Sequence, residues 1–209
     1  MNKINYQNEL DSILKDINKE KLPRLLLHAC CAPCSSYVLE YLSGYFDITV
    51  YFYNPNISPV SEFDKRFSEL KRLIEEMPLK NEVKLIKGVY RYLDYLDTAE
   101  GFEDVPEGGA RCFRCYRLRL EKTAQLAKEE DFDFFCTTLT ISPLKNSEKI
   151  NEIGFELEEE YGVRWLPSDF KKKEGYKRSI ELSREYNLYR QNFCGCVYSR
   201  NVEKENSIE

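Results

Sequence analysis

The sequence predicts an α/β protein built on an open parallel β-sheet with helices on both faces. Short apolar runs rich in strand-forming residues alternate along the chain with longer segments of helical pattern, which is typical of parallel sheets. The 209 residues are 42% hydrophobic, enough to bury one good core. We therefore expect one domain over residues 1–209, with a sheet core over 22–166 and a helical C-terminal extension over 167–209.

Five runs are predicted strands, in chain order. Leu25-Leu26-Leu27-His28 is an apolar run of strand length, and Ile48-Thr49-Val50-Tyr51-Phe52 adds β-branched and aromatic residues. Val83-Lys84-Leu85-Ile86 and Phe132-Asp133-Phe134-Phe135-Cys136 follow, and Val163-Arg164-Trp165-Leu166 is a fifth.

The segments around these strands are predicted helices, because they show helical patterns. They lie near residues 5–19, 34–43, 59–76, 111–129, 147–161 and 176–187. The clearest loops are Asn54 to Pro59 and Asp104 to Gly109, which are rich in proline, glycine or asparagine.

No targeting or membrane segment is visible. Met1 to Lys21 is polar and lacks the apolar stretch of an export signal, and no run approaches the length of a membrane-spanning helix. We therefore expect a cytoplasmic protein without membrane contact. In that reducing compartment the eight cysteines would stay largely as thiols, free to bind metal or to cycle as a redox pair.

Six of the eight cysteines fall into three tight groups. They are Cys30-Cys31 with Cys34 close behind, Cys112-x-x-Cys115, and Cys194-Gly195-Cys196. Grouped thiols on separate segments, in a chain without an export signal, usually converge on a metal or redox centre rather than form structural disulfides. We therefore expect the fold to bring them together.

The predicted elements place these groups at ligand-binding positions. Cys30 and Cys31 follow the first strand, and Pro33 begins a helix, so thiols occupy the place of a phosphate loop. No G-x-x-x-x-G-K or G-x-G-x-x-G motif occurs. Cys112 and Cys115 lie in a first helical turn, where backbone N–H groups and the helix dipole lower thiol pKa values. Taken alone, this pair could equally be a chance pair or part of a structural zinc site.

The number of thiols favours an iron–sulfur centre. A mononuclear zinc site takes four ligands, whereas the groups offer six thiols, or seven with Cys34. A [4Fe-4S] cluster on four cysteines plus a separate redox pair accounts for six. Alternatively, the surplus thiols hold an additional iron beside the cluster.

The Cys194-Gly195-Cys196 segment is the best candidate for the redox pair. Gly195 permits the sharp turn that so short a separation requires, and a disulfide in so small a ring would be readily reduced. The alternative is a turn with two buried thiols. We expect Cys136 to pack in the core, and Cys34 to be either a helix-start thiolate or a residue packed behind the site.

Charge is uneven along the chain. The formal net charge of -5 argues against an indiscriminate polyanion binder. Basic residues nevertheless gather beside two cysteine pairs: Arg111, Arg114, Arg117 and Arg119, then Lys171, Lys172, Lys173, Lys177, Arg178, Arg184 and Arg190. Each cluster alone could be a solvated helix face, but two of them beside cysteine pairs favour an anionic substrate.

Three motifs together identify a family resemblance. The chain contains, in order, His28-Ala29-Cys30-Cys31-Ala32-Pro33-Cys34, Cys112-x-x-Cys115-Tyr116-x-x-Arg119 and Tyr189-Arg190-Gln191-x-x-Cys194-Gly195-Cys196. From residue 24 to about 200 it resembles epoxyqueuosine reductase of the QueH type. The scaffold of that family is similar to the adenine-nucleotide alpha-hydrolase group, with the phosphate loop converted to cysteines.

The resemblance implies a single catalytic domain that reduces the epoxide of epoxyqueuosine to the alkene of queuosine. The substrate would be the wobble position of the tRNA anticodon, and the reaction would be the last step of queuosine biosynthesis. It also implies a [4Fe-4S] cluster on Cys30, Cys31, Cys112 and Cys115, with Cys194 and Cys196 as a redox-active pair. An external low-potential donor would supply the electrons. Cys30 and Cys31 can share a cluster only if the loop turns between them.

The reaction also needs a proton donor, for which Asp169, His28 and Tyr198 are candidates. Asp169 joins Cys194 and Cys196 as a predicted catalytic residue, although it could equally be a helix cap or a second metal ligand. His28, the one histidine of the chain, could equally be a hydrogen-bonded structural residue.

Binding of tRNA would use cations on phosphates and aromatic rings on bases. Tyrosines near the basic clusters are candidates for stacking: Tyr116, Tyr176, Tyr189 and Tyr198. Two other functions remain open. A tRNA-thiolation enzyme with a PP-loop-like fold should carry a Ser-Gly-Gly phosphate loop where this chain has cysteines, and a zinc-stabilised RNA-binding module would contain no iron.

Overall fold

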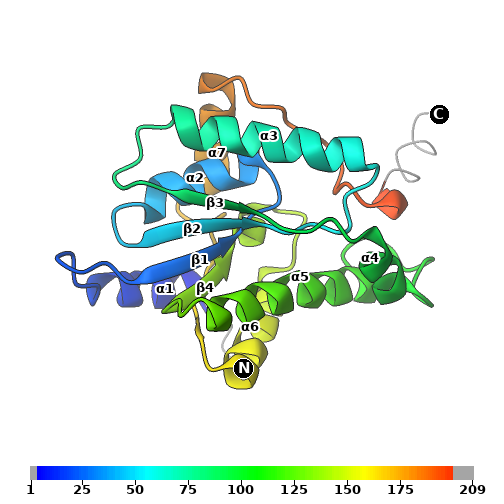
Figure 1. Ribbon diagram of the computed structural model, residues 1–209, viewed down its shortest axis with the longest axis horizontal. Coiled ribbons are helices and arrows are strands. Elements are labelled where there is room, and N and C mark those ends of the chain that lie inside the picture. The colour runs from blue at the N-terminus through cyan, green and yellow to red at the C-terminus, as the bar shows by residue number, and fades with distance from the viewer. Residues whose placement is uncertain (1–3, 200–209) are drawn as a thin grey trace.

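The computed structural model describes residues 4–199 and contains a five-stranded, all-parallel sheet (Figure 1). Its strand order is β3-β2-β1-β4-β5. The bounds are β1 Arg24–His28, β2 Asp47–Phe52, β3 Lys84–Lys87, β4 Phe134–Thr137 and β5 Arg164–Trp165. All five predicted strands are therefore confirmed, with ends that differ by up to two residues.

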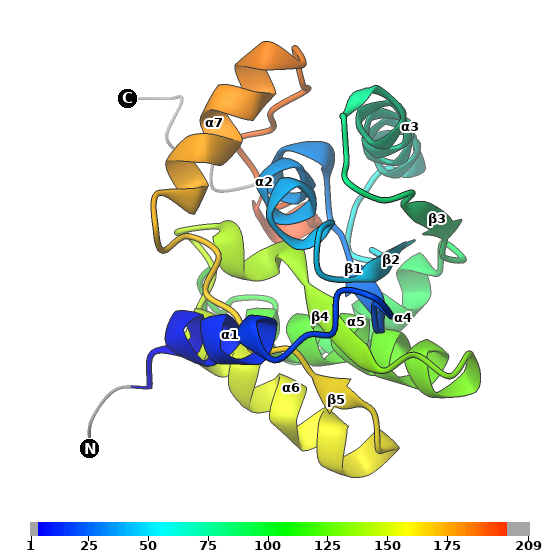
Figure 2. The same ribbon diagram turned by 90° about the vertical axis from the view of Figure 1, so that its left-hand side faces the viewer.

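Helices cover both faces of the sheet, as predicted. Figure 2 shows α2, α3 and α7 on one side of the strands, with α5 and α6 on the other. The helices are α1 Tyr6–Lys15, α2 Ala32–Leu42, α3 Val60–Glu76, α4 Tyr92–Ala99, α5 Ala110–Glu129, α6 Ser147–Tyr161 and α7 Gly175–Glu185. Over the described residues, every helix is too short or too polar to cross a membrane.

The core has two layers, one on each face of the sheet, and the side chains of the central strand β1 point alternately into them. Leu25 and Leu27 point into the layer formed with α1, α2 and α3, whereas Leu26 packs with α5 and α6 on the other face. All three leucines are fully buried, and each contributes roughly 2 kcal/mol through burial of its side chain. A strand with both faces covered must be apolar throughout, which explains the continuous Leu25-Leu26-Leu27 run.

Local sequence signals set the helix ends that matter for the site. Pro33 lies in the first turn of α2, where its fixed φ suits a helix start. Asn146 caps α6 by accepting the Lys149 N–H at 3.0 Å. Gly162 ends that helix with φ of 73°, a left-handed conformation that glycine adopts without strain.

Two short elements differ from the predictions. Helix α4 was not predicted, although Tyr95 and Ala99 are buried at helical spacing on one side of it. The predicted strand over 132–136 lies at 134–137 as β4, and it is followed by a short 3₁₀ helix over Thr138–Ile141. Thr137 bends the chain there, because its side chain accepts the Leu139 N–H.

The strand order creates a switch point at the carboxyl ends of β1 and β4. Strands β2 and β3 extend the sheet from one side of β1, and the chain then returns to place β4 on the other side. Ligands bind at such switch points in open α/β sheets. After α7, the chain runs to the side of the molecule where α4 and the start of α5 lie (Figure 1). The predicted C-terminal extension is thus described only up to residue 199, because residues 200–209 lie outside the described part.

Candidate active site

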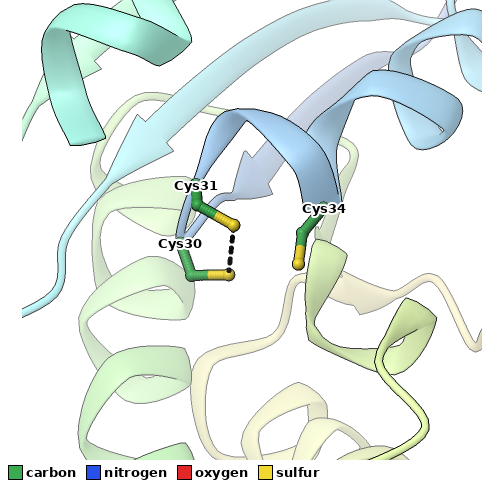
Figure 3. A group of neighbouring side chains, drawn as sticks. All are labelled: Cys30, Cys31 and Cys34. Carbon is green, nitrogen blue, oxygen red and sulfur yellow. Dashed lines mark hydrogen bonds between the residues drawn. The ribbon is translucent and has the colours of Figure 1, made fainter. Parts of the chain in front are cut away.

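The loop after β1 brings three thiols together. Cys31 is the extended residue just before α2, with φ of -171° and ψ of 163°, and Cys34 lies in the first turn of that helix. The sulfur atoms of Cys30, Cys31 and Cys34 all lie within 4.8 Å of one another, and those of Cys30 and Cys31 are 3.7 Å apart (Figure 3). The loop therefore turns as a shared ligand site requires, and Cys34 belongs to this group.

These three thiols share negative charge unevenly. The thiols of Cys30 and Cys34 donate toward the sulfur of Cys31, which holds the pKa of Cys31 well below its usual range. The same interaction with Cys31 raises the pKa of Cys30 to about 11. Bonds to Cys30 and Cys31, together with burial, also raise the pKa of Cys34. One thiolate held by two thiols is a ready set of sulfur donors for a metal.

The spacing fits metal binding. Two thiolates on one tetrahedral ion, with metal–sulfur bonds of about 2.3 Å, lie about 3.8 Å apart. The 3.7 Å between Cys30 and Cys31 matches this value. The donor set of this loop is therefore compatible with iron or another metal that prefers thiolates.

A second group of thiols lies where α5 meets the C-terminal segment. Cys112 and Cys115 are buried in the first turns of α5, and they line a narrow cavity together with Cys194 and Cys196. Gly195, between the last two cysteines, has φ of 106°, a backbone conformation that residues other than glycine rarely adopt. All eight cysteines of the chain are free thiols.

A larger cavity of about 470 Å³ joins the two groups. Its lining includes the three cysteines of the β1 loop and Cys194. It shares Asn56, Arg119, Lys145 and Cys194 with the narrow cavity, so the two cavities adjoin. Cys30 and Cys31 therefore line the larger cavity, and Cys112 and Cys115 line the narrow cavity beside it. The assignment of these four thiols as metal ligands stays a prediction.

Four cations line the larger cavity, and sequence reasoning identified them only in part. They are Arg66, Arg119, Lys145 and Arg190, beside the single acidic residue Glu107. The predicted basic clusters included Arg119 and Arg190 but neither Arg66 nor Lys145. Those two cations come from α3 and from the loop before α6, where no spacing of cysteines or cations pointed to the site.

Arg119 is buried between the thiol groups. Its Nε donates to the Cys115 carbonyl at 3.2 Å, and Nη1 lies 3.5 Å from Oδ1 of Asn54. Burial opposes its charge, but the nearby sulfur atoms of Cys115, Cys194 and Cys30 outweigh burial, so the pKa of Arg119 is raised. This buried positive charge is one of the causes that lower the pKa of Cys194.

The three candidate proton donors have different surroundings. His28 is fully buried, and its ring nitrogens lie 2.8 Å from Thr137 Oγ1 and 3.0 Å from the Tyr53 carbonyl oxygen. Burial lowers its pKa to about 3, so His28 is neutral and both its ring nitrogens have partners, as the structural alternative predicts.

Asp169 is buried, and its carboxylate pairs with Lys171 at 2.5 Å. It lines neither of the two cavities. Tyr198 stacks against Arg111, with 4.4 Å from Cζ to the ring centroid.

Most members of the predicted basic clusters have carboxylate or carbonyl partners within the chain. Arg117 pairs with Glu156 and Glu160, Arg178 pairs with Glu40, and Lys173 pairs with Asp11. Arg111 donates to the carbonyls of the loop before α5. Partners within the chain therefore already engage most of the basic residues that the sequence singled out.

The candidate stacking tyrosines differ in exposure. Tyr116 is 1% exposed, and Tyr189 donates its hydroxyl to Glu62. Tyr176 is 37% exposed and lines the larger cavity. Of the four predicted tyrosines, Tyr176 is thus the one whose ring is both accessible and beside that cavity.

Comparison with known proteins gives a consistent result. The family model described as "Epoxyqueuosine reductase QueH" matches residues 25–202. A protein of that name from Streptococcus pyogenes is 46% identical over 204 residues, which cover 96% of this chain and 80% of that protein. A protein of the same name from Staphylococcus epidermidis is 43% identical over 202 residues, which cover 94% of this chain and 85% of that protein. The one from Thermotoga maritima is 36% identical over 193 residues, which cover 88% of this chain and 94% of that protein.

A solved structure shows a weaker likeness. The U34-tRNA thiolase NcsA from Methanococcus maripaludis, with its [4Fe-4S] cluster, matches at a TM-score of 0.40 and 13% identity, covering 96% of this chain and 79% of that one. This similarity is too low to carry over the role of any residue.

Proposed function

The chain belongs to the family of epoxyqueuosine reductases of the QueH type, and from this premise we propose that it reduces the epoxide of epoxyqueuosine to the alkene of queuosine in tRNA. The reaction takes place at the wobble position and is the last step of queuosine biosynthesis. One observation carries the proposal: thiols from three distant parts of the chain line two adjoining cavities at the switch point of the sheet.

The cofactor of the proposal is an iron–sulfur cluster. Cys30, Cys31, Cys112 and Cys115 are the proposed ligands of a [4Fe-4S] cluster, and the grouping of Cys34 with the first pair supports it as a further sulfur donor. The surplus of thiols leaves room for an additional iron. When bound, such a cluster supplies single electrons at low potential.

Cys194 and Cys196 are the proposed redox pair. Conversion of two thiols into one disulfide releases two electrons and two protons, the number consumed when an epoxide becomes an alkene and its oxygen leaves as water. Cys194 lines both cavities, so it faces the substrate space as well as the thiols of α5. An external low-potential donor must then reduce the disulfide to restore the dithiol.

The larger cavity is the proposed substrate site. Its volume of about 470 Å³ lies within the range of pockets that enclose small ligands. Enzymes that modify a base in a nucleic acid turn the nucleotide out of its stack into such a pocket. Of the cations that line the cavity, Arg190 is suited to a phosphate of that nucleotide or of a neighbour.

Asp169 stays the proposed proton donor, although its carboxylate is now paired with Lys171. Asp169→Asn keeps the shape of the side chain and removes its ability to bind and release a proton. If single-turnover reduction in this variant is as fast as in the wild type, Asp169 has no part in the chemistry.

The proposed function is tested on protein purified without oxygen. We expect iron and acid-labile sulfide in the sample, and loss of the epoxide when the reduced protein meets a stem-loop that carries epoxyqueuosine. Protein with zinc and neither iron nor sulfide would instead support the RNA-binding module. Formation of a thiolated base would support the thiolation enzyme.

A further inference from the structure

We infer that the larger cavity recognises the Watson–Crick edge of a guanine-type base, with Arg66, Asn56 and Gln191 as its polar contacts. The inference rests on the proposed function, because that function brings a tRNA nucleotide into the cavity. It concerns which base is accepted, and it does not depend on the metal.

The first observation is a set of unsatisfied polar atoms. Among the described residues, three buried side-chain atoms of cavity-lining residues have no hydrogen-bond partner: Arg66 Nη2, Asn56 Oδ1 and Gln191 Oε1. Asn56 is 1% exposed and Arg66 is 2% exposed. Buried polar groups in folded proteins are nearly always paired, so three such atoms around one cavity indicate a ligand that pairs with them.

Arg66 is fixed so that one amino group remains available. Its Nε donates to Glu62 Oε1 at 2.7 Å, and its Nη1 donates to the Cys194 carbonyl at 3.1 Å. A Cβ added at Gly195 would lie 3.1 Å from Nη2, closer than side chains normally approach. Glycine at this position therefore keeps space beside the free donor.

Asn56 differs from its neighbour Asn54. The side chain of Asn54 is engaged at both ends, since Nδ2 donates to the Ala29 carbonyl at 2.8 Å and Oδ1 lies 3.5 Å from Arg119 Nη1. Asn54 thus holds the β1 loop against α5. The side-chain oxygen of Asn56 has no such partner, and Asn56 lines both cavities, which suits a ligand contact rather than a structural one.

The three free atoms form a distinctive chemical pattern of one donor and two acceptors. Arg66 Nη2 can only donate, whereas the oxygens of Asn56 and Gln191 accept. Guanine offers the complement, with O6 as acceptor and N1–H and the exocyclic amine as donors. The Watson–Crick edges of adenine, cytosine and uracil each offer at most one donor group. Epoxyqueuosine is a derivative of deazaguanine and keeps the guanine edge, so this pattern selects the base that the proposed reaction requires.

The test compares anticodon stem-loops with guanosine or inosine at the wobble position. Inosine keeps O6 and N1–H but lacks the exocyclic amine, so one acceptor of the protein loses its partner. We expect wild-type protein to bind the guanosine stem-loop about tenfold more tightly, as measured by fluorescence anisotropy, the order expected for a buried acceptor left unpaired. Replacing the acceptor that faces the amine should make the two affinities equal.

Two variants locate that acceptor, a third restores it, and a fourth is the matched control. Gln191→Met and Asn56→Leu each remove one acceptor at similar size, and Gln191→Glu restores an acceptor at position 191. Gln125→Met makes the same exchange on α5, where Gln125 bonds Lys122 instead of lining the cavity, so it should keep the wild-type preference. Circular dichroism of each variant separates lost discrimination from lost fold.

The outcomes separate the inference from the proposed function. Equal affinity of the wild type for both stem-loops overturns the inference alone, as does an unchanged preference in both Gln191→Met and Asn56→Leu. Failure of the wild type to bind either stem-loop overturns the proposed function as well. Loss of preference in one of the two variants, with the control unchanged, supports the inference.

Discussion

The Nζ of Lys145 lies 3.4 Å from the sulfur of Cys194 and 3.0 Å from Oε1 of Glu107. The Lys145 side chain is only 9% exposed, so this cation acts on the thiol with little screening by water. A bond from the Cys196 thiol, with Lys145 and Arg119 adding to it, holds the pKa of Cys194 well below its usual range. The same bond raises the pKa of Cys196, so Cys194 carries the negative charge of the pair.

Loss of the Lys145 cation should raise the pKa of Cys194. A thiolate forms above its pKa, so in Lys145→Met we expect the pH profile of Cys194 alkylation to move to higher pH by about one unit or more. Iodoacetamide labelling of anoxic protein, followed by mass spectrometry of the peptide carrying Cys194, measures this profile. Lys149→Met removes a cation that pairs with Glu152 on α6 and should leave the profile in place. An unshifted profile in Lys145→Met would show that the cation does not stabilise the thiolate.

Binding of tRNA should depend on the cations of the cavity and not on those paired elsewhere. In Arg190→Gln we expect weaker binding of an anticodon stem-loop and a salt dependence whose slope is smaller by about one. Arg178→Gln is the matched control, because Arg178 is already paired with Glu40 and Glu181. Titrations at several salt concentrations distinguish the two variants, and equal slopes would contradict the assignment of Arg190.

Cys34 should contribute to metal binding. In Cys34→Ser we expect metal affinity to fall by more than the roughly tenfold that loss of an outer-shell partner costs, measured as iron per chain after anoxic reconstitution. Cys136→Ser is the matched control, because Cys136 is fully buried in β4 and its thiol donates to the Leu166 carbonyl. If both variants bind as much iron as the wild type, Cys34 is a packed residue behind the site.

The contact between α6 and β5 should be sensitive to a single methyl group. A Cβ on Gly154 would lie 2.2 Å from Cε2 of Trp165, which is itself buried. We expect Gly154→Ala to lower the free energy of unfolding by about 1–3 kcal/mol through overpacking, measured by urea denaturation. Glu159→Ala, on the exposed side of the same helix, should change it by less than about 0.5 kcal/mol.

The sequence was sufficient for the sheet because its strands are buried on both faces. Leu25-Leu26-Leu27 and Phe134-Phe135-Cys136 are runs that only a covered strand accommodates. Helix α4 escaped prediction because it is short and its apolar residues serve a small cluster with Cys115 and Cys196, a long-range contact that local periodicity does not reveal.

The site was predictable in its thiols but not in their grouping. Cysteine spacing marked all three groups, whereas the placement of Cys34 beside Cys30 and Cys31 depends on the turn into α2. The sequence did not mark Lys145 or Arg66 as site residues, because each is one of 31 lysines and arginines in the chain. Their importance arises only when separate segments of the chain pack around the same cavity.

Hydrogen bonds join the C-terminal segment to α3 and to the loop before it: the Ser58 N–H donates to the Gly195 carbonyl at 3.0 Å, and the Arg66 side chain donates to the Cys194 carbonyl at 3.1 Å. Cys194 and Cys196 emerge from the ribosome after all five strands have been synthesised, and domains begin to fold from the N-terminal side during synthesis. The order of translation therefore means that a nascent chain halted before residue 194 would contain the four proposed cluster ligands and lack the proposed redox pair.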